Sequence, residues 1–200
     1  MQARAEKTRG NILRTARKLF AEHGFAGTGV DSIAEAAGAN KQRIYAYFGS
    51  KKKLFEAVLL DMFSESAADF AEFAAEMRPG DCDITFELSQ YYQHLHERHP
   101  EFRRLLAWAN LEDAIDPEIL RQARRSENEC LRNWFQSEQQ NHRLRTDVTF
   151  ESWLLTIMGA AYFASSNALT LAQTLGENFL SSAARRRRSE ELAKLFQPGG

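Results

Sequence analysis

A short stretch within the first 55 residues of this 200-residue chain gathers side chains that can bind a phosphate or the edge of a base. It reads NKQRIYAYFGSKKKLF, and its second to fourth residues are Lys41, Gln42 and Arg43. Lys and Arg suit O6 and N7 of guanine, and Gln suits N6 and N7 of adenine. We therefore predict that these three residues read bases in double-stranded DNA.

A short helix from Lys41 to about Phe48 would present them. Asn40 is suited to cap its N-terminus, and Ile44 and Phe48, four residues apart, would face inward. A helix of about eight residues is too short to be stable alone, and this one is too polar for a core element. Its exposed side chains are therefore expected to serve binding, and the N-terminal residues of a recognition helix are those that meet base edges.

The preceding residues complete a helix-turn-helix pattern. A first helix is predicted from about Ala5 to His23, ended by Gly24. Thr28 is expected to open a short second helix with Asp31 as its capping partner, and Gly38 would end it. Two helices joined by a short turn that contains Gly form a helix-turn-helix.

Three more side chains are predicted to contact phosphates without reading sequence. Tyr45 and Tyr47 can donate their hydroxyls to phosphate oxygens, and Lys51 lies near the start of the fourth helix, where backbone N–H groups also attract anions. The alternative for both tyrosines is packing at the rim between the third and first helices. For Lys52 and Lys53, a solvated helix face is the simpler interpretation.

The distribution of charge agrees with an anionic partner. Residues 1–53 carry eleven Lys or Arg against four Asp or Glu, a net charge of +7, so the rest must carry −8 to give the total of −1. Such asymmetry points to nucleic acid or an acidic membrane surface. The positive charge is spread over a compact unit instead of one long stripe, which weakens the membrane interpretation.

The whole chain is predicted to be all-α. Only four prolines occur, and apolar residues recur at helical spacing. We divide it into a helix-turn-helix domain at 1–53 and a second helical domain at 54–200, with about nine helices in total. Beyond the helix that Ser50 caps, which ends near Arg78, helices are expected at about Asp83 to Arg98, Pro100 to Leu111, Pro117 to Gln140, Thr146 to Gln173 and Gly176 to Phe196.

The stretch from Thr8 to Phe55 resembles the DNA-binding domain of the TetR family of transcriptional regulators. It contains the helix-one ending L-F-x-x-x-G-F, the turn T-x-V-x-x-I-A-x-x-A-G and the close Y-x-Y-F-x-x-K-x-x-L. The resemblance implies a homodimeric regulator, by default a repressor, that leaves a palindromic operator when a small-molecule effector enters the second domain. It also implies phosphate contacts from Thr28, Tyr45, Tyr47 and Lys51, and base reading at Lys41, Gln42 and Arg43.

The chain departs from the family pattern within the turn and the third helix. Ala39-Asn40 stands where Val-Ser is common, and Gln42-Arg43 stands where Gly-Thr is common. Two long hydrogen-bonding side chains should change which bases are read, so an operator cannot be transferred from a relative. By the same resemblance, the last two helices should form the dimer surface, and the small residues around Gly159 would permit close approach.

The second domain holds many aromatic residues that could line an effector pocket. Apolar cavities with a few polar groups are the usual form of such sites. The alternative is that these aromatics form the core. The residues chosen for the pocket are Tyr92, Trp108, Asn110, Trp153 and Asn167. We also expect the fourth helix, which begins beside Lys51, to transmit effector binding. Recognition helices must lie about 34 to 36 Å apart to enter successive major grooves, so a modest movement of this helix would spoil the fit.

Other functions have weaker support. His94 and His96 are about 200° apart on a helix and cannot share one ligand face, so no metal or other cofactor is predicted. No catalytic motif occurs, and an enzyme or small-molecule-binding protein with a vestigial helix-turn-helix remains the alternative to a regulator. Cys82 and Cys130 have no ligand spacing and are expected to be free thiols. The sequence shows neither a membrane span nor a signal peptide, which predicts a cytoplasmic protein.

Overall fold

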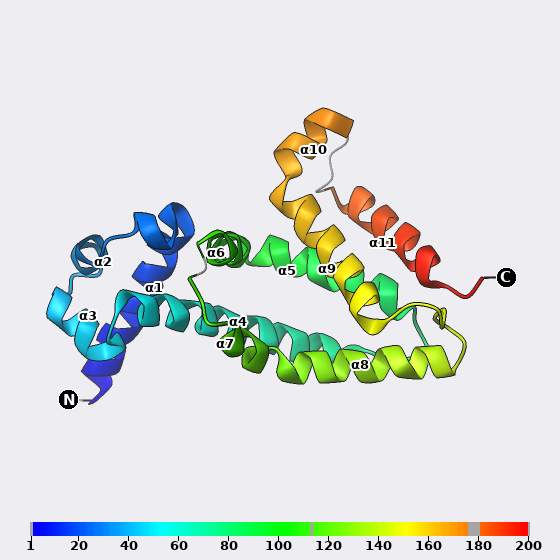
Figure 1. Cartoon of the computed structure of the whole chain (residues 1–200), viewed down its shortest axis with the longest axis horizontal. Coiled ribbons are helices and arrows are strands. Elements are labelled where there is room, and N and C mark those ends of the chain that lie inside the picture. The colour runs from blue at the N-terminus through cyan, green and yellow to red at the C-terminus, as the bar shows by residue number, and fades with distance from the viewer. Residues whose placement is uncertain (1, 113, 176–180, 200) are drawn as a thin grey trace. The chain divides into compact units, whose positions relative to one another are not determined.

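The computed structural model describes residues 2–112, 114–175 and 181–199, and within these ranges the chain is helical, without β-strands (Figure 1). This confirms the all-α prediction. The helices are α1 Gln2–Gly27, α2 Val30–Ala36, α3 Lys41–Phe48, α4 Lys51–Glu76, α5 Ile84–Arg98, α6 Pro100–Leu111, α7 Pro117–Ala123, α8 Arg125–Gln140, α9 Phe150–Ser166, α10 Ala168–Leu175 and α11 Ser182–Phe196.

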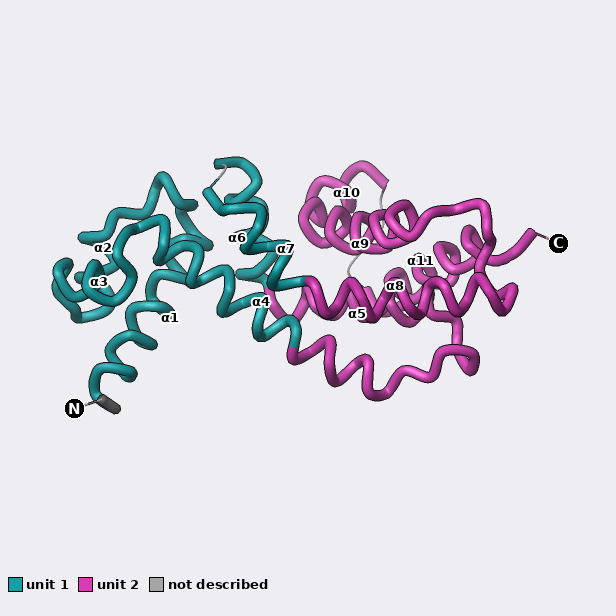
Figure 2. The backbone as a smooth tube through the Cα atoms, turned by 60° about the horizontal axis from the view of Figure 1, so that its bottom comes forward, with its two compact units in different colours: residues 1–67, 100–124 teal, residues 68–99, 125–200 magenta. Residues whose placement is uncertain are grey.

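The helices form two compact units, coloured separately in Figure 2. Unit 1 contains residues 1–67 and 100–124, and unit 2 contains residues 68–99 and 125–200. Each unit is therefore built from two separate chain segments, and α4 contributes residues to both. The functional division at residue 53 remains a prediction.

Unit 1 is organised around the first helix. Ile12, Ala16 and Phe20, at helical spacing on α1, are completely buried. The ring of Phe20 meets that of Phe55 on α4 edge to face, with centroids 5.0 Å apart. Ile33 of α2 is also fully buried. Burial of this apolar residue against the core holds α2 in place, because a helix of seven residues could not be stable alone.

The chain changes direction at Gly24, where φ is 75° and ψ is 177°. L-residues rarely adopt such a backbone conformation. A Cβ at this position would lie 2.8 Å from the ring of Trp108 on α6, so glycine is also required by the close contact. The glycine thus ends the long part of α1 near the predicted position.

The residues after Gly24 correct the role predicted for Thr28. Its hydroxyl donates to the carbonyl of Gly24 at 2.7 Å and to that of Leu19 at 3.1 Å, so Thr28 closes α1 instead of opening α2. Gly29 is the N-cap of α2 and makes no side-chain cap. The turn places the Thr28 hydroxyl beside the last carbonyls of α1, which lack partners within the helix.

A carboxylate that directly follows α6 completes this turn. Glu112 accepts hydrogen bonds from the backbone N–H groups of Phe25, at 2.8 Å, and Ala26, at 3.1 Å. These groups are the first donors of the helical turn that follows Gly24, so they have no partner within the helix. Glu112 therefore acts as an N-cap supplied by a distant part of the sequence.

Unit 2 is centred on α5, which packs against both α9 and α11. Trp153 of α9 is completely buried, and its indole Nε1 donates to Thr85 Oγ1 of α5 at 3.0 Å. The rings of Phe135 and Phe150 lie against the indole, with centroids 5.3 and 6.1 Å away. This aromatic cluster forms the core of unit 2.

The prediction of about nine helices joined two pairs that the structure separates, because no proline or glycine marks either break. The first break is at Arg124, where φ is −102° and ψ is 1°. The second is at Asn167, where α9 ends and α10 departs at 87°. The predicted start of the last helix, at Gly176, lies outside the described residues. No single described helix is long and apolar enough to cross a membrane, and α9 with α10 would be so only as a bent pair.

The arginine run in α11 is only partly a solvated face. Arg186 pairs with Glu190, four residues further along the helix, at 2.8 Å. Arg185 is instead buried, and its guanidinium bonds Glu97 of α5 at 3.2 Å. Arg188 donates to Gln93 Oε1 at 3.1 Å. Two of the four arginines thus hold α11 to α5.

Candidate nucleic-acid interface

The turn before α3 is fixed by backbone hydrogen bonds. The N–H of Ala39 bonds the carbonyl of Ala34 at 2.9 Å, and the N–H of Gly38 bonds that of Glu35 at 3.1 Å. This pair forms a Schellman motif, which requires the positive φ of 59° that Gly38 adopts. Asn40 then caps α3, accepting from the N–H of Arg43 at 2.7 Å, as predicted.

The buried side of α3 also matches the prediction. Ile44 and Phe48 are 1% and 8% exposed. Lys41, Gln42 and Arg43, in the first turn, are all exposed. The capping bond of Arg43 uses its backbone only, so the three side chains are not needed to form the helix. They are free to contact base edges in the groove of a DNA duplex.

One of the three side chains already has a partner. The ammonium of Lys41 lies 2.9 Å from Asp31 on α2, and both side chains are largely exposed. The hydrogen bond that the ammonium donates to the Asp31 carboxylate raises the pKa of Lys41, so the ammonium stays charged at neutral pH. Asp31 therefore offsets the charge of a residue predicted to read bases, a pairing across the turn that sequence reasoning missed.

The residues predicted to contact phosphate differ in accessibility. Tyr45 is 42% exposed, Tyr47 is half-buried, and Lys51 lies with its ammonium 4.5 Å from the ring centroid of Phe25. Thr28 is only 2% exposed, and its hydroxyl proton is engaged by backbone carbonyls. Its side chain has a structural role, so we retain only Tyr45, Tyr47 and Lys51 as phosphate contacts.

We expect Asp31→Asn to raise affinity for non-specific duplex DNA about two- to fivefold, because an exposed ion pair contributes only a small free energy. Freeing Lys41 should also steepen the salt dependence of binding by about one phosphate contact. Fluorescence anisotropy over a salt series measures both. Glu35→Gln removes the same charge from an exposed site on α2 that does not contact Lys41. Equal effects from the two variants would assign the change to net charge alone.

The five residues predicted for the effector pocket do not come together in one unit. Trp108 packs on Gly24 in unit 1, where Asn110 is exposed and bonds the carbonyl of Leu106. In unit 2, Tyr92 is buried and its hydroxyl donates to Glu127 at 2.7 Å. Trp153 belongs to the aromatic core described above, and Asn167 bonds its own helix. Four of the five residues thus use their polar side-chain atoms in hydrogen bonds within the protein, and the ring of Trp108 packs on Gly24, so a pocket made of these five residues is not retained.

Both thiols are in partly buried surroundings. Burial raises the pKa of Cys82 and of Cys130. Cys82 is also close to the carbonyl of Arg78, at 3.6 Å. A raised pKa reduces the thiolate fraction, so neither site has the character of a reactive thiol.

The geometry of unit 1 defines the class of protein: three helices form a helix-turn-helix unit whose third helix presents polar side chains in its first turn. Comparison with known proteins gives the family. Residues 12–58 match the family described as bacterial regulatory proteins, tetR family, and residues 87–195 match the family described as tetracyclin repressor-like, C-terminal domain. The chain belongs to the TetR family.

Individual relatives support the same family assignment. The HTH-type transcriptional repressor NicS of Pseudomonas putida is 32% identical over 187 residues, which cover 90% of this chain and 86% of NicS. The repressor AcnR of Corynebacterium efficiens is 31% identical over 194 residues, covering 84% and 91%. A TetR family transcription regulator from Marinobacter aquaeolei VT8 has the same fold, with a TM-score of 0.78, 20% identity and 98% of each chain covered.

Proposed function

We propose that this protein is a transcriptional repressor that binds a specific DNA operator through α3. The observation that carries the proposal is the first turn of α3, where Lys41, Gln42 and Arg43 project from a helix anchored on its opposite side by Ile44 and Phe48. The family supports a regulator over an enzyme. A regulator that acts on a bacterial genome would work in the cytoplasm.

Selection from random duplex DNA tests the proposal directly. The purified protein is incubated with the random pool at fixed moderate salt, because affinity for DNA depends strongly on ionic strength. An enriched two-fold palindrome is the expected result, with half-sites one helical turn apart. Weak binding without enrichment would contradict sequence-specific recognition and would favour the vestigial helix-turn-helix alternative.

We propose that the protein is a homodimer whose interface is formed by α9 and α11. Leu155 and Phe163 stand eight residues apart on α9, on the same side as Gly159, and are 72% and 58% exposed. On α11, Leu195 is 62% exposed. Large apolar side chains exposed together mark interaction surfaces, and a palindromic operator requires a two-fold dimer.

We expect Phe163→Glu to convert the dimer to a monomer, because a charge in an apolar interface loses its hydration without gaining a partner. Operator affinity should fall at least tenfold, since a monomer holds only one half-site. Analytical ultracentrifugation and anisotropy measure the two effects. Leu111→Glu is the matched control, because Leu111 is 75% exposed on α6. A Phe163→Glu variant that remains dimeric would contradict this interface.

We propose that a small-molecule effector controls DNA binding through α4. This helix carries Lys51 at its first position and ends at Glu76 in unit 2, so one continuous element joins the predicted phosphate contact to the second unit. An effector changes the equilibrium only if it binds the DNA-incompetent form more tightly. We therefore expect the effector to bind residues of unit 2.

A further inference from the structure

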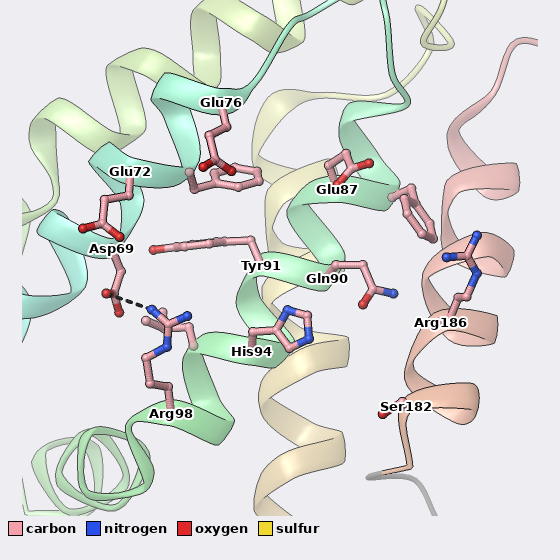
Figure 3. Close-up of a pocket in the computed structure, with 13 residues that line it drawn as sticks. Asp69, Glu72, Glu76, Glu87, Gln90, Tyr91, His94, Arg98, Ser182 and Arg186 are labelled. Atoms are coloured by element: carbon pink, nitrogen blue, oxygen red, sulfur yellow. Dashed lines mark hydrogen bonds and ion pairs between the residues drawn. The ribbon is translucent and has the colours of Figure 1, made fainter.

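Unit 2 contains a groove bordered by α4, α5 and α11 (Figure 3). Its volume is about 760 Å³, which lies in the range of small-molecule sites, roughly 300 to 1,000 Å³. Figure 3 shows Glu72 and Glu76 on α4 at one side, Tyr91 and Gln90 on α5 in the middle, and Arg186 on α11 at the other side. None of these residues is among the five chosen from the sequence for the effector pocket.

The groove carries an excess of negative charge. Four carboxylates line it, against two guanidinium groups and one imidazole. Both guanidinium groups are paired: Arg98 bonds Asp69 at 3.1 Å, and Arg186 bonds Glu190, outside the groove, at 2.8 Å.

The three remaining carboxylates belong to Glu72, Glu76 and Glu87. Within the part of the chain that the structure describes, their side chains make no ion pair or hydrogen bond. Glu72 and Glu76 are also one turn apart on α4, a spacing at which like charges destabilise a helix. A bound cation would relieve this repulsion, whereas a bound anion would add to it.

Aromatic faces accompany the carboxylates. Phe73 of α4 stacks on Tyr91 of α5, with ring centroids 4.7 Å apart and planes inclined by 23°. Phe86, also in the lining, already has the guanidinium of Arg186 5.5 Å from its ring centroid. The faces of such rings attract cations electrostatically, and this attraction strengthens where water is excluded. The rings and the carboxylates therefore favour the same kind of ligand.

An unsatisfied donor adds a second requirement. The amide nitrogen Nε2 of Gln90 is buried at the groove and finds no hydrogen-bond acceptor among the described residues. Buried donors are normally paired. A ligand that offers a carbonyl, ester or hydroxyl oxygen here would provide the missing acceptor.

We propose that this groove is the effector site and that its ligand is an organic cation with a hydrogen-bond acceptor. Its role as effector site rests on the proposed function, whereas the binding of the cation does not. Because Glu72 and Glu76 belong to α4, ligand binding acts on the same helix that carries Lys51.

Two probes that differ in a single atom test the charge requirement. Benzoylcholine has a quaternary ammonium, an ester and a ring, and 3,3-dimethylbutyl benzoate replaces the ammonium nitrogen with carbon. Isothermal titration calorimetry on the full chain is expected to show at least tenfold tighter binding of benzoylcholine. The triple variant Glu72→Gln, Glu76→Gln, Glu87→Gln should lose this preference. Asp61→Asn, which neutralises an exposed carboxylate of α4 outside the groove, should keep it.

The outcomes separate the two proposals. Equal binding of both probes, binding of neither, or an unchanged preference in the triple variant overturns the cation site, whatever the protein does with DNA. Benzoylcholine is then added to the complex with the selected duplex, and release of wild type but not of the triple variant is expected. Binding of the cation without release overturns the effector role. Failure to select any duplex contradicts the proposed function and leaves the calorimetric result intact.

Discussion

Alanine substitution of Lys41, Gln42 and Arg43 together is expected to lower operator affinity at least about 10³-fold, to the level of non-specific binding. The three side chains are exposed in the first turn of α3, the part of a recognition helix that meets base edges. Their removal should leave the fold unchanged, since Asn40 still caps the helix through the backbone N–H of residue 43 and Ile44 and Phe48 stay buried.

Anisotropy with the selected operator and a scrambled duplex, at one salt concentration, measures the loss. The matched control is the double variant Lys194→Ala, Arg125→Ala, which removes two positive charges from exposed positions on α11 and α8. It should bind both duplexes as wild type does. If the triple variant lost affinity for operator and scrambled duplex by the same factor, the three side chains would contribute only charge, and base reading would be excluded.

Gly24→Ala is expected to reduce the free energy of unfolding by about 3 kcal/mol, combining backbone strain with overpacking. Alanine at this position would have to adopt a φ of 75°. Its methyl group would lie 2.8 and 2.9 Å from ring atoms of Trp108. It would also lie 3.0 Å from the Glu112 carboxylate that caps the following turn. Relief of the clash would require Trp108 to move away from α1.

Chemical denaturation followed by circular dichroism measures this effect. Gly10→Ala is a matched control on the same helix, because a methyl group there meets only the Arg14 side chain, at 3.6 Å. Alanine has the higher helix propensity, so Gly10→Ala should stabilise the protein by about 0.5 to 1 kcal/mol. Similar free energies for both variants would show that neither the positive φ nor the Trp108 contact constrains Gly24.

The sequence by itself determined the elements that local interactions control. Asn40 and Gly49 delimit α3, and the spacing of Ile44 and Phe48 defines its buried side, because capping and helical periodicity act within one or two turns. The same local patterns carried the resemblance to the TetR family. They failed at Arg124 and Asn167, because no proline or glycine marks either interruption of the helix.

The tertiary structure alone decided which distant residues meet. Glu112 caps a turn that begins 87 positions earlier in the chain, at Phe25. Asp31 pairs with Lys41 across the turn, although its spacing three residues after Thr28 suggested a local cap at the start of α2. Trp153 and Tyr92 were chosen as pocket residues because aromatic spacing is the same in a core and in a cavity.

The groove of unit 2 has the same origin. Glu72 and Glu76 come from α4, Glu87 and Gln90 come from α5, and the third side is α11. Each carboxylate looks like an ordinary solvated residue in its own helix. Only the packing of the three helices brings the unpaired charges, the aromatic rings and a buried amide together, because side-chain packing depends on contacts between segments that no local pattern encodes.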